Sequence, residues 1–311
     1  MNPRPEKALF EEAAALKGMA VSFLEKDWFV TQVIATLGAL EQPGFEIKFS
    51  GGTALSKGHG LLQRFSEDVD FRVRAPQAVN RKTLSGFKHA VVAALRQQGF
   101  ALSDEQIKAG DGNRFVAMEL VYESVFTQPA ALRPHLQIEL TVSDIVLPPV
   151  LCSVSSFINE LAKRAPEVAA IGCLDPVESA ADKLSAVTWR IPDRIRGQAG
   201  DDPTIVRHLH DLAILKDRAL AHAQFPTLVA TLVAKDDGRA KNTPAFSGLP
   251  VAEKFRQMLD VLERDLQYVK EYDRFVKGVS YAREGETPDF AQALQAAREL
   301  VEMVLAQAPK S

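Results

Sequence analysis

The periodicity of hydrophobic and polar positions differs between the two halves of this chain. Up to about residue 172, stretches with the two-residue period of strands alternate with helical stretches. The predicted strands are 45–49, 69–73, 115–122, 136–142 and 147–154, and the predicted helices are 6–18, 22–40, a short one through 55–62, and 81–98. This part is therefore predicted to be a mixed α/β domain.

After Gly172 nearly every stretch has helical period. Asp175, Pro176 and Glu178 occupy N-cap, N1 and N3 positions, which is typical of a helix start. The predicted helices cover about 176–190, 203–220, 222–235, 250–277 and 288–307. The predicted fold class is α/β (α+β), with an α/β domain at 1–172 that includes the N-terminal helices, and an α-helical C-terminal domain at 173–311.

The strongest chemical signal is the stretch RFSEDVDF, residues 64–71. On a strand, Asp68 and Asp70 project from the same face, about 6–7 Å apart, while Val69 and Phe71 face the other way. Two carboxylates so close repel unless a cation lies between them. Mg²⁺ takes carboxylate oxygens together with substrate phosphates, so the pair is a candidate magnesium site. The alternative is a pair of solvated acids on an edge strand.

A third acid comes from the strand LQIELTV at 136–142. Its alternation places Glu139 on the polar face with Gln137 and Thr141. If this strand lies beside 69–73, Glu139 can reach the same metal.

The loop FSGGTALSKGHG, residues 49–60, precedes the acids and follows an apolar strand. It lacks the spacing of a P-loop. Gly51, Gly52 and Thr53 nevertheless offer backbone N–H groups, a hydroxyl and a helix start, which together suit a phosphate. Lys57 lies one turn further on as a supporting cation. The alternative is a tight strand-to-helix turn.

Composition narrows the class of protein. The 311 residues are 46% hydrophobic and 25% charged, which is ordinary for a globular protein. The net charge of −3 gives no indication of an extended basic surface for nucleic acid. Local Arg and Lys residues at 190–196 and 239–241 keep RNA open as a partner. Cys152 and Cys173 have no metal-like spacing and are expected to be buried free thiols. With no signal peptide or membrane span in the sequence, a cytoplasmic protein is expected.

Four motifs, GGTALSK (51–57), RFSEDVDF (64–71), DKLSAVTWR (182–190) and RHLHDLAIL (207–215), together with EKDWFVTQVI (25–34), resemble the AbiEii/AbiGii-type nucleotidyltransferase toxins of bacteria. The resemblance spans about 190 residues in the family's order. It implies a nucleotidyltransferase-like mixed sheet followed by a helical domain, with the active site in the cleft between the two.

The resemblance also implies an enzyme that uses Mg²⁺, or Mn²⁺, to transfer a nucleotidyl group from a nucleoside triphosphate with release of pyrophosphate. Members of this family are toxins of toxin–antitoxin and phage-defence systems, with a separately encoded antitoxin. Some mycobacterial relatives modify the 3′ end of tRNA. A monomer that acts on an RNA such as tRNA, away from membranes, is the resulting expectation.

In the helical half, Lys183 is expected to neutralise the triphosphate, because the phosphate oxygens require a cation and the resemblance implies that the matching lysine is functional; the alternative is a solvated lysine. Asp211 is expected either to orient Lys183 or to act as a general base toward the acceptor. Arg207, four residues before Asp211, is expected to hold Asp211 or a phosphate, the alternative being a surface ion pair.

Ser66, beside the acids, suggests control by phosphorylation, because a phosphate there would repel the triphosphate. An unmodified peptide 65–72 in toxin co-expressed with its antitoxin would exclude this hypothesis. Two other functions stay open at this point: an aminoglycoside-type transferase of small molecules, and a non-catalytic binding module.

Overall fold

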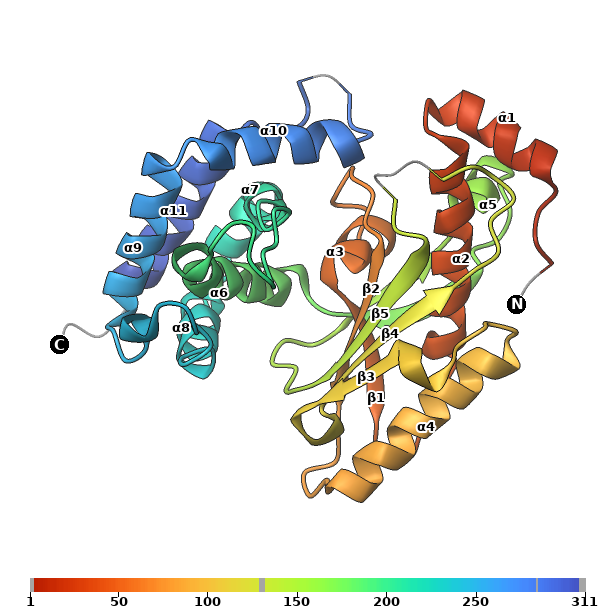
Figure 1. The fold of residues 1–311 in the computed structure, drawn as a ribbon, viewed down its shortest axis with the longest axis horizontal. Helices are drawn as coiled ribbons and strands as arrows, with labels where there is room; N and C mark the ends of the chain where they lie inside the picture. The colour runs from red at the N-terminus through yellow and green to blue at the C-terminus, as the bar shows by residue number, and fades with distance from the viewer. Residues whose placement is uncertain (1–2, 129–131, 284, 308–311) are drawn as a thin grey trace. The chain divides into compact units, whose positions relative to one another are not determined.

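The computed structural model describes residues 3–128, 132–283 and 285–307 (Figure 1). The chain divides into two compact units. The first, here called the α/β unit, contains Met1–Gly60 and Phe65–Asp175, and the second, the helical unit, contains Leu61–Arg64 and Pro176–Ser311. The short segment Leu61–Arg64 thus belongs to the helical unit, although the residues on both sides of it in the chain belong to the α/β unit.

A seven-stranded mixed sheet forms the centre of the α/β unit, in the order β3-β4-β5-β2-β1-β7-β6. The parallel pairs are β2 with β5 and β1 with β7, and the other neighbours are antiparallel. The strands are β1 (Glu46–Ser50), β2 (Asp68–Arg74), β3 (Ile107–Gly110), β4 (Phe115–Val121), β5 (His135–Val142), β6 (Val150–Val154) and β7 (Val168–Cys173).

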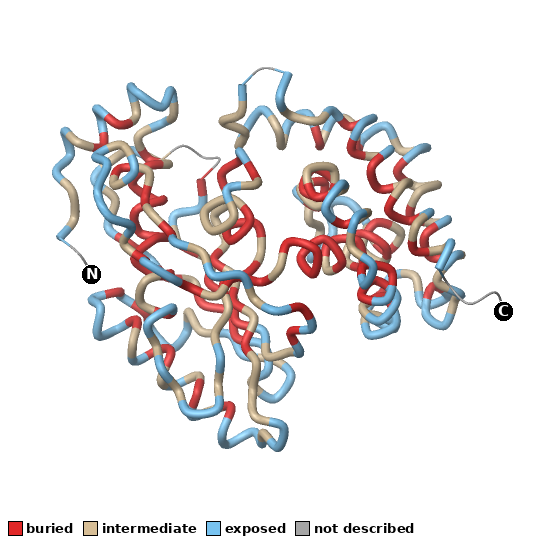
Figure 2. The backbone as a smooth tube through the Cα atoms, turned by 180° about the vertical axis from the view of Figure 1, so that it is seen from behind, coloured by how far each residue is buried: buried red, intermediate tan, exposed pale blue. Residues whose placement is uncertain are grey.

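One face of this sheet carries the core, and buried positions gather along its strands (Figure 2). Val69, Phe71 and Val73 of β2 are buried in a hydrophobic cluster with side chains of α2 (Val21–Gly38) and α4 (Arg81–Gln97). The two-residue period predicted for this strand is confirmed. The acids of β2 therefore lie on the face opposite this core.

The remaining helices of this unit are short except for the first. They are α1 (Lys7–Lys17), α3 (Gly51–Thr53), which continues into a π-helical turn, η1 (Ala54–Gly58), and α5 (Phe157–Leu161). The predicted helix through 55–62 therefore begins earlier, at Gly51, and ends before the glycine Gly60. Strands β3 and β7 and helix α5 were not predicted, because VAAIGC and IKAG are poor in β-formers and α5 has only five residues.

The helical unit consists of α6 (Pro176–Asp193), α7 (Arg207–Leu220), α8 (Phe225–Lys235), α9 (Val251–Arg264), α10 (Gln267–Val279) and α11 (Phe290–Gln307). Helix α6 starts at the predicted Pro176. The predicted single helix 250–277 is wrong: it breaks at Asp265, which has an extended backbone after α9 and whose carboxylate accepts a hydrogen bond from the N–H of Gln267, the first residue of α10. Among the described residues, none of the helices has the length and apolarity to cross a bilayer.

Three consecutive charged side chains of α2, Glu25, Lys26 and Asp27, are buried. Burial of a charge is costly unless a partner compensates it. Glu25 accepts hydrogen bonds from Ser124 and from the N–H of Val125 at 3.0 Å. The charge of Glu25 therefore holds the loop after β4.

The other two charges hold the segments beside the acid strand. Lys26 Nζ lies 2.5 Å from Glu67 Oε2 and donates to the carbonyl of Arg133. Asp27 pairs with Lys57 Nζ at 2.5 Å and accepts the N–H of Phe157 at 2.7 Å. Through these pairs, α2 fixes the end of the glycine loop and the residue before Asp68.

We expect Asp27→Asn to lower the free energy of unfolding by about 3–5 kcal/mol, because it leaves Lys57 buried without its counter-charge. The double variant Asp27→Asn, Lys57→Met should recover part of this loss. Urea unfolding followed by circular dichroism measures both, with the exposed Asp104→Asn as control. Equal stability of Asp27→Asn and Asp104→Asn would contradict this role of the ion pair.

Candidate active site

The pairing of β2 with β5 brings two acids of the α/β unit side by side. Asp70 is the direct partner of Glu139, and Asp68 is the partner of Gln137. Parallel neighbours lie about 4.8 Å apart and point their paired side chains to the same face. Glu139 therefore lies next to Asp70 on the face opposite the core. The role expected of Glu139 required its strand to lie beside 69–73, and it does.

On the other side of β2, the glycine loop begins against the acids. Ser50, the last residue of β1, is the register partner of Asp70, and Gly51 follows with φ of +73°. A Cβ atom at Gly51 would overlap with the Asp70 carboxylate. Only glycine allows both this backbone conformation and this close approach. The loop and the metal-binding candidates thus form one constellation.

Thr53 links the loop to the acid strand. Its hydroxyl is buried and donates to the backbone carbonyl of Asp68. A hydroxyl has a single proton to donate, so this contact already uses it. Thr53 positions the acid strand in this structure, and its contact with a phosphate stays a prediction. Gly52, also buried, lies in the same turn.

Lys57 lies in an ion pair rather than in the open. Its ammonium is held by Asp27 and stacks over the ring of Phe157 at 4.8 Å. Burial raises the pKa of the Asp27 carboxyl, and the neighbouring charge of Lys57 opposes that shift. The observed partners give Lys57 a structural role, and the expected contact with a phosphate would require this pair to open.

Asp68 already holds a cation. Its Oδ1 accepts a hydrogen bond from Arg133 Nη1 at 2.8 Å, and the backbone N–H of Arg133 binds Glu67. The side chain of Arg133 is half exposed. A guanidinium paired with this acid shows that positive charge is favourable at the position where a metal was predicted. No motif in the sequence pointed to Arg133, which comes from a loop far along the chain.

The helical unit contains a second charged group, centred on Asp211. Arg64 binds both oxygens of this carboxylate, with Nε at 2.8 Å and Nη2 at 2.7 Å, and Lys183 Nζ lies 2.8 Å from Oδ2. His210 approaches Oδ1 at 3.2 Å. Lys183 is only 7% exposed, so the interpretation as a solvated lysine is wrong. The ion pair between Asp211 and Lys183 is the contact that the orienting role expected of Asp211 would need, and the role itself stays a prediction.

The charges around Asp211 decide its protonation. Complete burial by itself would raise the pKa of this carboxyl, but Arg64 and Lys183 hold the pKa well below its usual range. An acid with such a low pKa is a weak proton acceptor. This geometry favours the orienting role over that of general base.

One of the two roles expected of Arg207 was to hold Asp211, and the structure does not show that contact. Arg207 pairs instead with Asp202, at 3.2 Å, and with the hydroxyl of Thr204. The residue that does hold Asp211 is Arg64, the first residue of the RFSEDVDF motif. Its place in that motif was the available signal, although a separation of 147 residues concealed the pair.

Comparison with known proteins agrees with this geometry. The sequence model of the family described as "Nucleotidyl transferase AbiEii toxin, Type IV TA system" matches residues 37–296, most of the chain. The chain belongs to the AbiEii family of nucleotidyltransferase toxins. No protein of curated function matches it.

A solved structure extends the likeness of this AbiEii toxin to the whole fold. MenT4, the nucleotidyltransferase toxin Rv2826c from Mycobacterium tuberculosis H37Rv, is similar over 97% of this chain and 98% of its own, with 20% identity and a TM-score of 0.53. The predicted fold class and the predicted enzyme class are confirmed. Membership in a type IV toxin–antitoxin family implies a separate antitoxin.

We expect Gly51→Ala to lower nucleotidyl transfer about 100-fold, because the added methyl group displaces the Asp70 carboxylate. Gly18→Ala is the matched control: Gly18 also has positive φ, at +64°, but has open space around its Cα. Both variants carry the backbone strain of about 1–2 kcal/mol. Steady-state transfer rates separate the two effects, and equal rates would contradict the role of Gly51.

We expect Asp211→Asn to lower the free energy of unfolding by about 3–5 kcal/mol at pH 7. The native pKa is depressed, so the wild-type advantage is fully present above the unfolded pKa of about 3.9 and declines as pH falls below it. The difference between wild type and variant should therefore narrow in acid. Urea unfolding from pH 7 to pH 3 measures this, with the exposed Asp217→Asn as control; a constant difference would contradict it.

Proposed function

We propose that this AbiEii toxin transfers a nucleoside monophosphate from a nucleoside triphosphate to an acceptor, with release of pyrophosphate, and that Asp68, Asp70 and Glu139 bind the required Mg²⁺. The observation that carries the proposal is the register of β2, which places Glu139 beside Asp70 on one side and the glycine loop against Asp70 on the other.

The chemistry of the donors fits the metal. The three acids supply carboxylate oxygens on one face of a sheet, which is the ligand type that Mg²⁺ and Mn²⁺ take. Bound metal would neutralise the triphosphate and activate its α-phosphorus toward attack. The Arg133 guanidinium at Asp68 would have to yield its place or turn to a phosphate as the metal enters.

The protein's own groups would orient the substrate. Gly51 and Gly52 leave room for a phosphate to approach the backbone N–H groups at the start of the turn, and Thr53 keeps that turn attached to Asp68. Lys57 supports the loop through Asp27.

We propose that Lys183 supplies a cation to the triphosphate and that Asp211 orients it. Asp211 is fully buried and forms ion pairs with both Lys183 and Arg64, so it would hold these two positive groups in place. Arg207, already paired with Asp202, is a weaker candidate for the phosphates.

The acceptor we propose is RNA, with the 3′ end of tRNA as the first candidate. The basic segment 190–196 gives this less support than its composition indicated, because its arginines are paired within the helical unit. Arg190 binds Asp202, Arg194 binds Asp201 and Glu271, and Arg196 binds Asp265. Direct pairing of this kind leaves less charge for phosphates.

Regulation by the antitoxin is proposed to act on this same constellation. Ser66 is half buried, two residues before Asp68. A phosphate there would add negative charge beside the metal-binding acids, so phosphorylation at Ser66 stays a prediction. A monomer working in the cytoplasm in a phage-defence system is likewise proposed from the family.

We expect the purified toxin with Mg²⁺ and total cellular RNA to incorporate label from one of the four labelled triphosphates into tRNA. Asp70→Asn and Lys183→Ala should each abolish incorporation while circular dichroism stays unchanged, and the surface variant Asp104→Asn should retain it. Full activity of folded Asp70→Asn would refute the metal site. Label in an aminoglycoside instead of RNA would indicate a small-molecule transferase, and binding of neither triphosphate nor metal would indicate a non-catalytic module.

A further inference from the structure

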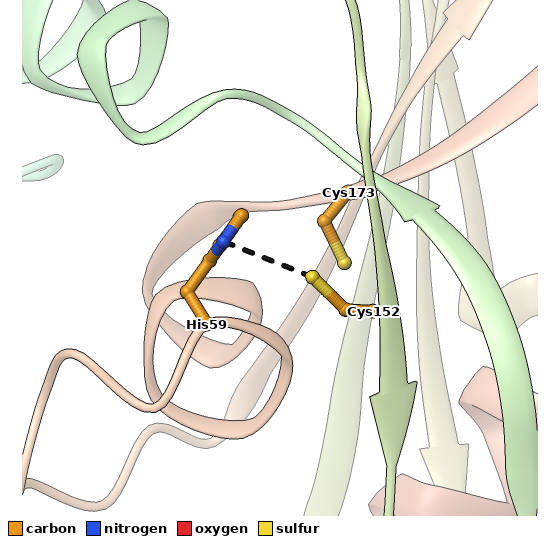
Figure 3. A group of neighbouring side chains, drawn as sticks. All are labelled: His59, Cys152 and Cys173. Carbon is orange, nitrogen blue, oxygen red and sulfur yellow. Dashed lines mark hydrogen bonds between the residues drawn. The ribbon is translucent and has the colours of Figure 1, made fainter.

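The fold brings together three side chains of types that commonly bind metals, although they lie far apart in the sequence. His59, Cys152 and Cys173 each present a ligand atom, and all three atoms lie within 4.8 Å of one another (Figure 3). Cys152 comes from β6 and Cys173 from β7, two adjacent antiparallel strands at one edge of the sheet. His59 directly follows η1. Cys173 is buried as predicted, but the expectation that Cys152 is also buried is wrong, because it is half exposed.

The histidine ring is already oriented for a metal. Its Nε2 lies 3.0 Å from the carbonyl oxygen of Leu174, which can only accept, so Nε2 carries the proton. In the neutral ring Nδ1 is then unprotonated, and it faces Cys152 Sγ at 3.7 Å. A backbone carbonyl that binds the second ring nitrogen is the usual support of a metal-ligating histidine.

The spacing suits a tetrahedral ion. A Zn²⁺ ion with two thiolates and one imidazole requires Sγ to Sγ separations of about 3.8 Å and Sγ to N separations of about 3.6 Å. The observed Nδ1 to Sγ distance of 3.7 Å already matches, and the upper limit of 4.8 Å leaves at most about 1 Å of contraction elsewhere.

The backbone at Gly58 passes close to the two sulfurs. A Cβ atom at Gly58 would approach Cys173 Sγ to 2.8 Å and Cys152 Sγ to 3.9 Å. A larger residue would therefore push the end of η1 away from the two cysteines. Glycine at this position lets the turn that carries His59 lie directly above them.

We propose that His59, Cys152 and Cys173 form a Cys₂His binding site for Zn²⁺, separate from the carboxylate metal site of the same unit. Two thiolates and a neutral imidazole compensate the charge of the ion, and soft sulfur ligands discriminate against Mg²⁺. Binding releases the two thiol protons, so affinity rises with pH. The half-exposed Cys152 gives an entry path from the sheet edge.

The site has a defined mechanical consequence. Gly51–Gly58 is a single run of helix and π-helix, so an ion bound at His59 would anchor the far end of the glycine loop to β6 and β7. Zn²⁺ is therefore expected to raise the thermal stability of the α/β unit. This inference does not rest on the proposed nucleotidyl transfer, and its test does not measure that activity.

The test is titration of the reduced, chelator-treated full chain with Co²⁺ and then Zn²⁺, in excess Mg²⁺. We expect one equivalent of Co²⁺ to give thiolate-to-cobalt charge-transfer absorption and the intense visible bands of a tetrahedral site, both removed by Zn²⁺. Cys152→Ser and His59→Gln should each weaken binding at least about tenfold, while the exposed His89→Gln should leave it unchanged.

A second measurement needs no variant, because Zn²⁺ should slow alkylation of Cys152 in the wild-type chain, as followed by mass spectrometry. Absence of the charge-transfer absorption, or undiminished binding by folded Cys152→Ser, would overturn the proposal. A Cys152–Cys173 disulfide that forms in air, in a chain whose reduced form binds no Zn²⁺ or Co²⁺, would overturn it as well.

Discussion

The α/β unit depends on the requirement that buried charges be paired. Helix α2 places Glu25, Lys26 and Asp27 in the interior, and each must find its partner on another segment. Lys26 thereby fixes Glu67 beside the acid strand, and Asp27 fixes Lys57 at the end of the glycine loop. Removal of one charge leaves its partner buried and unpaired, so the positions of the surrounding loops and the stability of the unit are linked.

The same requirement organises the helical unit, where Asp211 holds Arg64 and Lys183. A carboxylate with two cationic partners has a low pKa and keeps those cations in place. Such a group costs little reorganisation when an anionic substrate arrives, because its positive charges are already oriented. The role proposed for Asp211, to hold Lys183 and Arg64 in place, needs no direct contact between Asp211 and the substrate.

Two groups of side chains that could bind metal ions lie along one sheet. The acids of β2 and β5 offer only oxygen, whereas β6, β7 and the end of η1 offer sulfur and nitrogen. Because hard and soft ions prefer different donors, the two proposed sites would select different ions even in excess Mg²⁺. The glycine loop runs between them, with Gly51 against Asp70 and Gly58 against Cys173.

The sequence by itself determined the alternation of β2 and β5, the glycine loop, the helical second half and the family. Those features are local, since they follow from period, turn residues and short motifs. Only the tertiary structure decided which distant residues meet: Arg64 with Asp211, Arg133 with Asp68, and His59 with the two cysteines. These contacts follow from strand order and from the pairing of buried charges, and neither leaves a periodic trace in the chain. Lys57 shows the difference: its motif suggested a phosphate ligand, and only the tertiary structure reveals that its side chain is buried in an ion pair with Asp27.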